Sequence, residues 1–188
     1  MPVTDVKLED RVEDLIQAAA VAKGLLPILV RALVIQESGG RVWAWNPEPG
    51  YRYLWDIKQK RPFRKLTEQE LLSKFPPKDF PAPAGVDRDA EWWGQQSSWG
   101  YMQVMGAVAR ECGYVGVFLG GLYEPAINLE FGCRHLKGLA SRYLATAGWP
   151  GVVAAYNAGS PRVLENGQYE NQAYVNDVLN ILGGVWPK

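Results

Sequence analysis

The stretch "PILVRALVIQESGG", residues 27–40, decides the fold because it combines the pattern of an apolar helix, a charged residue at the end of that helix and two glycines that terminate it. Proline suits the first turn of a helix, and Gly39 and Gly40 offer a left-handed C-terminal cap. The pattern therefore predicts a helix at 27–38 that is buried on nearly all sides. Glu37 carries a charge in the last turn of this helix, which needs an explanation.

Glu37 shares its helix face with apolar residues three, four and seven positions earlier, namely Val34, Leu33 and Val30. The carboxyl group is therefore expected to point inward or into a cleft. Poor solvation and the negative end of the helix dipole both disfavour its charged form, so we expect a raised pKa. A carboxylic acid that keeps its proton near neutral pH can act as a general acid. The alternative is that Glu37 pairs with a buried arginine or caps a neighbouring helix.

Helical spacing recurs along most of the chain, so the expected fold class is mainly α. The further predicted helices are at 5–22, at 105–112, from Glu124 and Pro125 onward, at 150–157 and at 172–182.

The region 43–96 differs in texture, because it is rich in proline and tryptophan and has little periodicity. We interpret it as an ordered insertion, since it is too aromatic for a disordered linker. Within it, "YRYLW" at 51–55 is a candidate short strand, and Thr67 with Glu70 forms a capping box for a short helix. Its tryptophans either pack in the core and loops or serve as platforms for flat apolar faces such as sugar rings.

Length and composition exclude several classes of function. With 188 residues the chain is expected to form one domain over 1–188, and 20 Lys and Arg against 20 Asp and Glu give no net attraction to nucleic acid. One histidine and two cysteines indicate neither a metal site nor a disulfide framework, so we expect no metal and no cofactor. His135 is interpreted as structural, and the spacing of Cys112 and Cys133 leaves their pairing open.

The N-terminal residues and the apolar runs of the sequence indicate in which cellular compartment the protein is made. The acidic residues 1–15 lack the basic start of a signal peptide, and the longest apolar run, 24–35, is interrupted by Pro27 and Arg31 and is too short for a transmembrane segment. We therefore expect a protein made in the cytoplasm that needs help to reach any target outside it.

Two later stretches carry candidate site residues. "SSWGYMQVM", 97–105, places a glycine where backbone can approach a ligand, although a glycine before a helix is more often only a turn. "AAYNAG", 154–159, ends a helix on which Tyr156 needs a hydrogen-bond partner if its face is buried, and a buried carboxyl group would supply one. Asn157 could satisfy local backbone or contact a substrate.

Taken together, five motifs resemble the lytic transglycosylase catalytic domain, which is related to goose-type lysozyme. In chain order they are "QESGG", "SWGYMQVM", "EPAINLEFGCRHL", "AAYNAGS" and "ENQAYVNDVL". The resemblance covers residues 10–182 apart from the insertion 43–96, which is longer than the usual link after the first motif. Tyr101 replaces the usual leucine, and Asn171 replaces the usual threonine.

The resemblance implies a lysozyme-like, mainly α fold with a cleft for peptidoglycan glycan strands. Glu37 corresponds to the catalytic acid, with Tyr156 expected to orient it. The implied substrate-binding residues are Ser38, Ser98, Gly100, Tyr101, Met102, Gln103, Met105, Asn157, Ala158, Gly159, Glu170 and Tyr174.

The implied reaction cleaves the β-1,4 bond between N-acetylmuramic acid and N-acetylglucosamine and leaves a 1,6-anhydro end. A first alternative is a lysozyme-type muramidase, which needs a second carboxylate to activate water. The insertion offers five candidates, which we interpret as solvated loop charges: Glu48, Asp56, Asp87, Asp89 and Glu91. A second alternative is a glycan-binding structural component without catalysis, although such a protein has no chemical need for Glu37.

A wall-cleaving enzyme without its own export signal suggests a phage protein. It would reach the cell wall in a virion or be released at lysis, with other virion proteins or a pore-forming protein as candidate partners. Export of a bacterial protein by a dedicated machine is the alternative.

Overall fold

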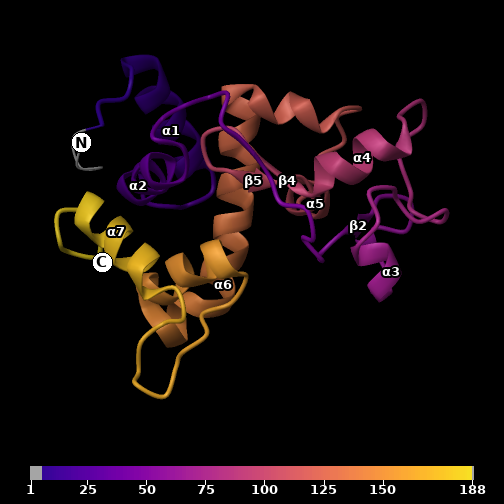
Figure 1. Ribbon diagram of the computed structural model, residues 1–188. Coiled ribbons are helices and arrows are strands. Elements are labelled where there is room, and N and C mark those ends of the chain that lie inside the picture. The colour runs from indigo at the N-terminus through magenta and orange to yellow at the C-terminus, as the bar shows by residue number, and fades with distance from the viewer. Residues whose placement is uncertain (1–5, 188) are drawn as a thin grey trace. The chain divides into compact units, whose positions relative to one another are not determined.

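The computed structural model describes residues 6–187, and its chain divides into two compact units. Unit 1 combines the chain up to Gly40 with the chain from Gly132 onward, and unit 2 is Arg41–Phe131. Helices dominate, and short antiparallel strands lie in unit 2 (Figure 1). The prediction of a mainly α fold with a small β element is confirmed. The expectation of one domain over 1–188 stays a prediction.

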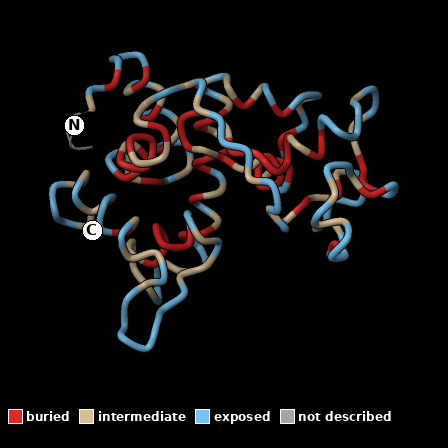
Figure 2. Tube along the Cα trace, viewed as in Figure 1, coloured by how far each residue is buried: buried red, intermediate tan, exposed pale blue. Residues whose placement is uncertain are grey.

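Unit 1 is helical. It holds α1 (Asp10–Ala22), α2 (Pro27–Ser38), α7 (Gln172–Ile181) and most of α6 (Pro125–Ala158). α2 packs against both α1 and α7, which lie beside it in Figure 1. Most of α2 is buried (Figure 2), so this helix forms the core of the unit.

The bounds of α2 are those that the sequence predicts. Pro27 occupies the first helical position, and Gly39 ends the helix in the left-handed conformation with φ 59° and ψ 28°. Arg31 is a polar residue near the middle of this helix, and its Nε donates a 2.7 Å hydrogen bond to Glu13 of α1. Helix α7 ends one residue before its predicted end, at Ile181.

Helix α1 begins later than predicted. Residues 6–9 are not helical, and the helix starts at Asp10 with Glu9 as its N-cap residue. The apolar positions Val12, Ile16 and Ala20 are buried as expected, so the amphipathic pattern located the helix correctly. Asp5, where the prediction began, lies outside the described residues.

Helix α6 contains a sharp break at Gly148, whose φ of 62° and ψ of −172° are not helical. Glycine tolerates a positive φ without a Cβ clash, and Pro150 suits the first turn of the resumed helix. The two helices predicted on either side of this point are therefore both present, joined at a kink.

The strands of unit 2 form two small antiparallel sheets. The first has the order β1 (Trp45–Pro47), β4 (Ser97–Trp99), β5 (Val104–Met105), and the second pairs β2 (Trp55–Asp56) with β3 (Arg61–Pro62). Of the predicted strand at 51–55, only Trp55 is extended and paired. Strand β1 lies at an edge, and Trp45 is opposite Trp99 on β4.

Three α-helices and one 3-10 helix complete the described secondary structure of unit 2 before α6. Helix α3 (Glu68–Leu71) has the predicted capping box, since Thr67 accepts from the Glu70 N–H and Glu70 accepts from the Thr67 N–H. Helix α5 (Gly106–Glu111) lies within its predicted range. Helix α4 (Arg88–Gln95) was not predicted, and the 3-10 helix η2 (Leu119–Tyr123) was not predicted either.

The insertion has a core of its own within unit 2. Leu54, Leu66, Phe80 and Trp92 are buried together. The rings of Phe80 and Trp92 meet edge to face with centroids 5.1 Å apart, a favoured aromatic geometry. The interpretation of this region as ordered is therefore confirmed. Within the described part of the chain, no helix is long and apolar enough to cross a membrane.

Candidate active site

Glu37 lies in the last turn of α2, and its side chain is half-buried. The residues predicted to share its helix face, Val30, Leu33 and Val34, are fully buried, so the predicted apolar face is confirmed. The chain turns away at Gly39, directly after the helix. A carboxyl group is thus held next to apolar side chains, at a helix end where partial negative charge gathers.

Helix α7 brings a tyrosine hydroxyl to this carboxyl group. The hydroxyl of Tyr174 donates a hydrogen bond to Oε1 of Glu37. Burial, the Glu37 carboxylate and the hydrogen bond to it raise the pKa of Tyr174 well above that of free tyrosine. The hydroxyl therefore keeps its proton. Because a hydroxyl can donate and accept, it can partner Glu37 in either protonation state.

Two further rings belong to this neighbourhood in unit 1. The rings of Tyr156 and His135 lie 5.3 Å apart at 52°, and Tyr156 is close enough to Tyr174 to contribute to its raised pKa. Burial and, to a smaller extent, Arg142 lower the pKa of His135 to about 4, so its ring is uncharged at neutral pH. Direct orientation of Glu37 by Tyr156 stays a prediction.

Ser38, the residue after Glu37, is buried, and its hydroxyl donates to the Val34 carbonyl at 3.0 Å. Such a bond to the carbonyl four residues earlier is a common way for a helical serine to satisfy its hydroxyl. In this structure Ser38 therefore completes the end of α2. The substrate-binding role implied by the resemblance stays a prediction.

The end of α6 and the start of α7 are tied together by two asparagines. Nδ2 of Asn171 donates to Oδ1 of Asn157 at 2.9 Å and to the Ala154 carbonyl at 3.0 Å. The partner of the Asn157 side chain is thus another side chain rather than the local backbone, and its contact with a substrate stays a prediction. Gly159 follows with φ 79°, after the half-buried Ala158.

Glu170 is exposed and forms an ion pair with Arg162 at 3.1 Å. Both side chains are more than half exposed, so this pair contributes little to stability. Its carboxylate is open to solvent and can meet a ligand. In unit 1 the structure thus brings Glu37, Tyr156 and Tyr174 near one another, whereas Glu170 lies on the loop before α7.

The motif of unit 2 forms a tight turn between β4 and β5. Gln103 spans this turn, with its Nε2 donating to the Ala44 carbonyl at 3.0 Å and the Gly100 carbonyl at 2.9 Å. Its Oε1 accepts from the Ser98 hydroxyl at 3.0 Å. Gln103 itself has a positive φ of 45°, which is uncommon for a residue with a side chain. The glutamine and serine thus fix the backbone of the turn.

Asn128 of α6 is a site residue that sequence reasoning missed. It is fully buried, its Oδ1 accepts from the Met102 N–H at 2.8 Å, and its Nδ2 donates to the Trp99 carbonyl at 2.7 Å. A Cβ at Gly100 would come within 2.6 Å of Nδ2 of Asn128, which explains the glycine. The available signal was an asparagine among the apolar residues of "EPAINLEF".

The remaining residues of this motif differ in exposure. Tyr101 and Met102 are buried, whereas Met105 is half-buried on β5. The buried pair anchors the turn in unit 2. The contribution of all three residues to substrate binding stays a prediction.

Most carboxylates of the insertion form hydrogen bonds or ion pairs within unit 2. Asp56 is buried and accepts from two backbone N–H groups at 2.9 Å, so it is not the solvated loop charge that was predicted. Asp87 caps α4. Glu91 is buried and bound to Arg110, so its interpretation as a solvated loop charge was wrong. Asp89 is exposed on α4, and Glu48 is half-buried. Across residues 6–187, no three His, Cys, Asp or Glu side chains are gathered to hold a metal ion.

Chemically, unit 1 offers one carboxyl group beside apolar side chains, with a neutral hydroxyl on one of its oxygens. This arrangement suits transfer of a proton to and from a bound molecule. The sequence model of a family described as "Transglycosylase SLT domain" matches residues 14–178. No curated protein matches the chain, and no solved structure does.

Proposed function

We propose that this chain, which belongs to the transglycosylase SLT domain family, is a peptidoglycan lytic transglycosylase with Glu37 as its catalytic acid and base. The mainly α fold agrees with a lysozyme-like domain of that family. The observation that carries the proposal is the contact between Glu37, at the end of a buried helix, and the Tyr174 hydroxyl. The bond to be cleaved is the β-1,4 linkage between N-acetylmuramic acid and N-acetylglucosamine.

The first step is protonation of the leaving group. Glu37, in its acid form, gives its proton to the glycosidic oxygen while the bond from this oxygen to the anomeric carbon breaks. N-acetylglucosamine leaves with a free 4-hydroxyl. The acetamido oxygen of N-acetylmuramic acid stabilises the cation at the anomeric carbon, so no second carboxylate is needed as a nucleophile.

The second step closes the ring. Glu37, now a carboxylate, takes the proton of the 6-hydroxyl of N-acetylmuramic acid, and that oxygen bonds to the anomeric carbon. The product has a 1,6-anhydro end, no water is consumed, and Glu37 regains its proton. A hydroxyl that can partner both forms of Glu37 suits this double use, and Tyr174 supplies one.

A hydrolase would instead need a second carboxylate about 5 to 9.5 Å from the first. Three of the five candidate carboxylates of the insertion already have partners within the fold. Glu91 forms an ion pair with Arg110, and Asp56 and Asp87 accept hydrogen bonds from backbone N–H groups. These observations favour the route that uses a single carboxylate, and the muramidase remains the alternative to be tested.

Product analysis tests the proposal. Purified peptidoglycan is digested with the chain, and the soluble fragments are weighed before and after reduction with borohydride. We expect muramic ends that are lighter by one water than reducing ends and that resist borohydride. A muramidase that uses water is run in parallel as a reference. Reducible ends like those of the reference would show that the chain is a hydrolase and not a transglycosylase. If no fragments are released, both activities are excluded.

Replacement of Tyr174 by phenylalanine removes the hydroxyl that donates to Glu37 and keeps the ring. A hydrogen bond to a charged group contributes about 1.5–3 kcal/mol, so Tyr174→Phe should lower kcat/KM about 10- to 100-fold. Tyr169→Phe is the matched control, because the Tyr169 hydroxyl makes only a 3.5 Å contact with the Ala147 carbonyl in the same unit. Equal kcat/KM for both variants would show that the Tyr174 hydroxyl does not serve Glu37.

The route by which the chain meets the cell wall is a separate proposal. Virion delivery, or release at lysis with a pore-forming protein, stays a prediction of the sequence. Proteomic analysis of purified particles from a producing host would test it, since a virion protein should be recovered with the particles.

A further inference from the structure

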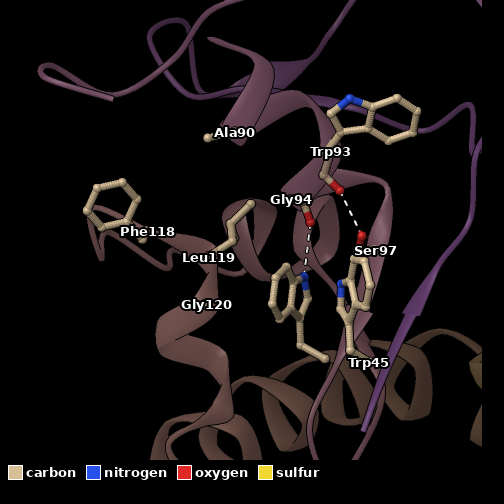
Figure 3. A pocket seen from close by; sticks show the side chains of 9 residues that line it. Trp45, Ala90, Trp93, Gly94, Ser97, Phe118, Leu119 and Gly120 are labelled. Carbon is tan, nitrogen blue, oxygen red and sulfur yellow. Dashed lines mark hydrogen bonds between the residues drawn. The ribbon is translucent and has the colours of Figure 1, made fainter. Parts of the chain in front are cut away.

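Unit 2 contains an open aromatic pocket of about 240 Å³. We use the name aromatic pocket for the space lined by the side chains of Trp45, Trp93, Trp99, Phe118 and Leu119. In Figure 3, Phe118 and Trp93 lie on opposite sides of Leu119. The pocket is smaller than the roughly 300–1,000 Å³ typical of sites for drug-sized ligands, so it suits a single ring.

The indoles of Trp45 on β1 and Trp99 on β4 form one wall of this pocket. Trp45 and Trp99 are cross-strand partners, with ring centroids 6.2 Å apart and planes at 47°. The Trp99 indole is fixed further, because its Nε1 donates to the Gly94 carbonyl at 3.0 Å. Trp45 lies on an edge strand and is 51 % exposed, so one indole is rigid and its neighbour is open to solvent.

Several polar groups at the pocket wall are hydrogen-bonded to one another. The Ser97 hydroxyl donates to the Trp93 carbonyl at 2.8 Å, and the Gly94 carbonyl accepts from Trp99. None of the residues that line the pocket is charged. A phosphate or a metal ion would therefore find no oppositely charged side chain here, and the lining offers mainly aromatic faces.

We propose that the aromatic pocket of unit 2 is a binding site for one N-acetylhexosamine ring of a glycan strand. The face of an indole carries the negative part of the ring quadrupole, and the C–H groups on one face of a pyranose carry partial positive charge. A sugar ring can therefore stack on Trp45 or Trp99 while its hydroxyls stay in water. The choice of sugar rests on the proposed function, whereas the pocket itself does not.

Several lining residues come from the insertion 43–96, including Trp45, Ala90 and Trp93. The long link after the Glu37 helix thus has a use beyond covering core surface, because it supplies much of an aromatic wall. Trp43 offers a matched comparison within the same segment. It is 69 % exposed, Arg41 lies 6.0 Å from its ring, and it does not line the pocket.

The test uses the full chain with Glu37→Gln, so that the probe is not consumed, and titrates it with the β-1,4-linked trimer of N-acetylglucosamine. Nitrogen–proton NMR spectra follow the indole N–H signals. We expect the signals of Trp45 and Trp99 to move together. Trp45→Ala should weaken the affinity read from the Trp99 signal about tenfold, because one stacking partner is lost, whereas Trp43→Ala should change it less than about twofold.

Unmoved Trp45 and Trp99 signals at millimolar trimer would overturn the proposal, as would equal affinities of the two variants. Larger shifts with an apolar peptide than with the trimer would also overturn it, because the pocket would then take a peptide side chain. Binding here is read without turnover, so it can fail while anhydro products still form. It can equally succeed while the proposed reaction fails.

Discussion

The isosteric change Glu37→Gln is expected to lower the rate of peptidoglycan cleavage by about 10³- to 10⁴-fold, the upper part of the range for a general acid or base. The amide can neither give a proton to the glycosidic oxygen nor take one from the 6-hydroxyl, so both steps lose their proton carrier. The fold should survive, because the Tyr174 hydroxyl can donate to the amide oxygen as it does to Oε1 of Glu37.

The measurement is release of soluble fragments from purified peptidoglycan, with thermal unfolding followed in parallel. Glu165→Gln is the matched control, because it makes the same chemical change at an exposed position of unit 1. It should keep the parent rate within about twofold, as expected for a surface substitution away from the site. A folded Glu37→Gln chain that retains a tenth or more of the parent rate would remove Glu37 from its assigned role.

Local features of the fold were predictable because their causes lie within a few residues. Pro27 and Gly39 delimit α2 by backbone preferences alone, and the capping box of Thr67 and Glu70 is a short-range pattern. The apolar face beneath Glu37 follows from helical geometry. These predictions were therefore right without knowledge of tertiary contacts.

The partner of Glu37 could not be found in the same way. Tyr174 is 137 positions away in sequence, and nothing local states that α7 packs against α2. Sequence reasoning assigned Tyr174 to substrate binding and chose Tyr156 to orient the acid. The tertiary structure shows that the Tyr174 hydroxyl reaches Oε1 of Glu37, and orientation of the acid by Tyr156 stays a prediction.

Helix α4 was missed because it is short and follows a stretch rich in proline and glycine. Signals for it were present, since Asp87 is a good N-cap residue and Glu91 and Gln95 are spaced four apart. The sequence alone favours a solvated charge at Glu91. In the structure Glu91, Trp92 and Gln95 are all buried, because their partners come from other segments.

Glu91 and Arg110 form a nearly enclosed ion pair that joins α4 to α5. Their side chains are 1 % and 3 % exposed, and two parallel bonds of 2.8 and 2.9 Å connect them. Gln95 donates a further bond to Glu91, and Arg110 also donates to the carbonyls of Tyr114 and Gly116. Arg110 thus fixes the loop after α5 only while its own charge is balanced.

Glu91→Ala is therefore expected to destabilise unit 2 by about 3–5 kcal/mol, because it leaves the Arg110 cation buried without its carboxylate. Urea unfolding followed by tryptophan fluorescence measures this directly, since six of the eight tryptophans lie in unit 2. Glu111→Ala, an exposed change on α5, should shift the free energy of unfolding by no more than about 0.5 kcal/mol. Equal midpoints and slopes for the two variants would mean that the buried pair contributes no more to stability than a surface charge does, and that it does not hold α4 against α5.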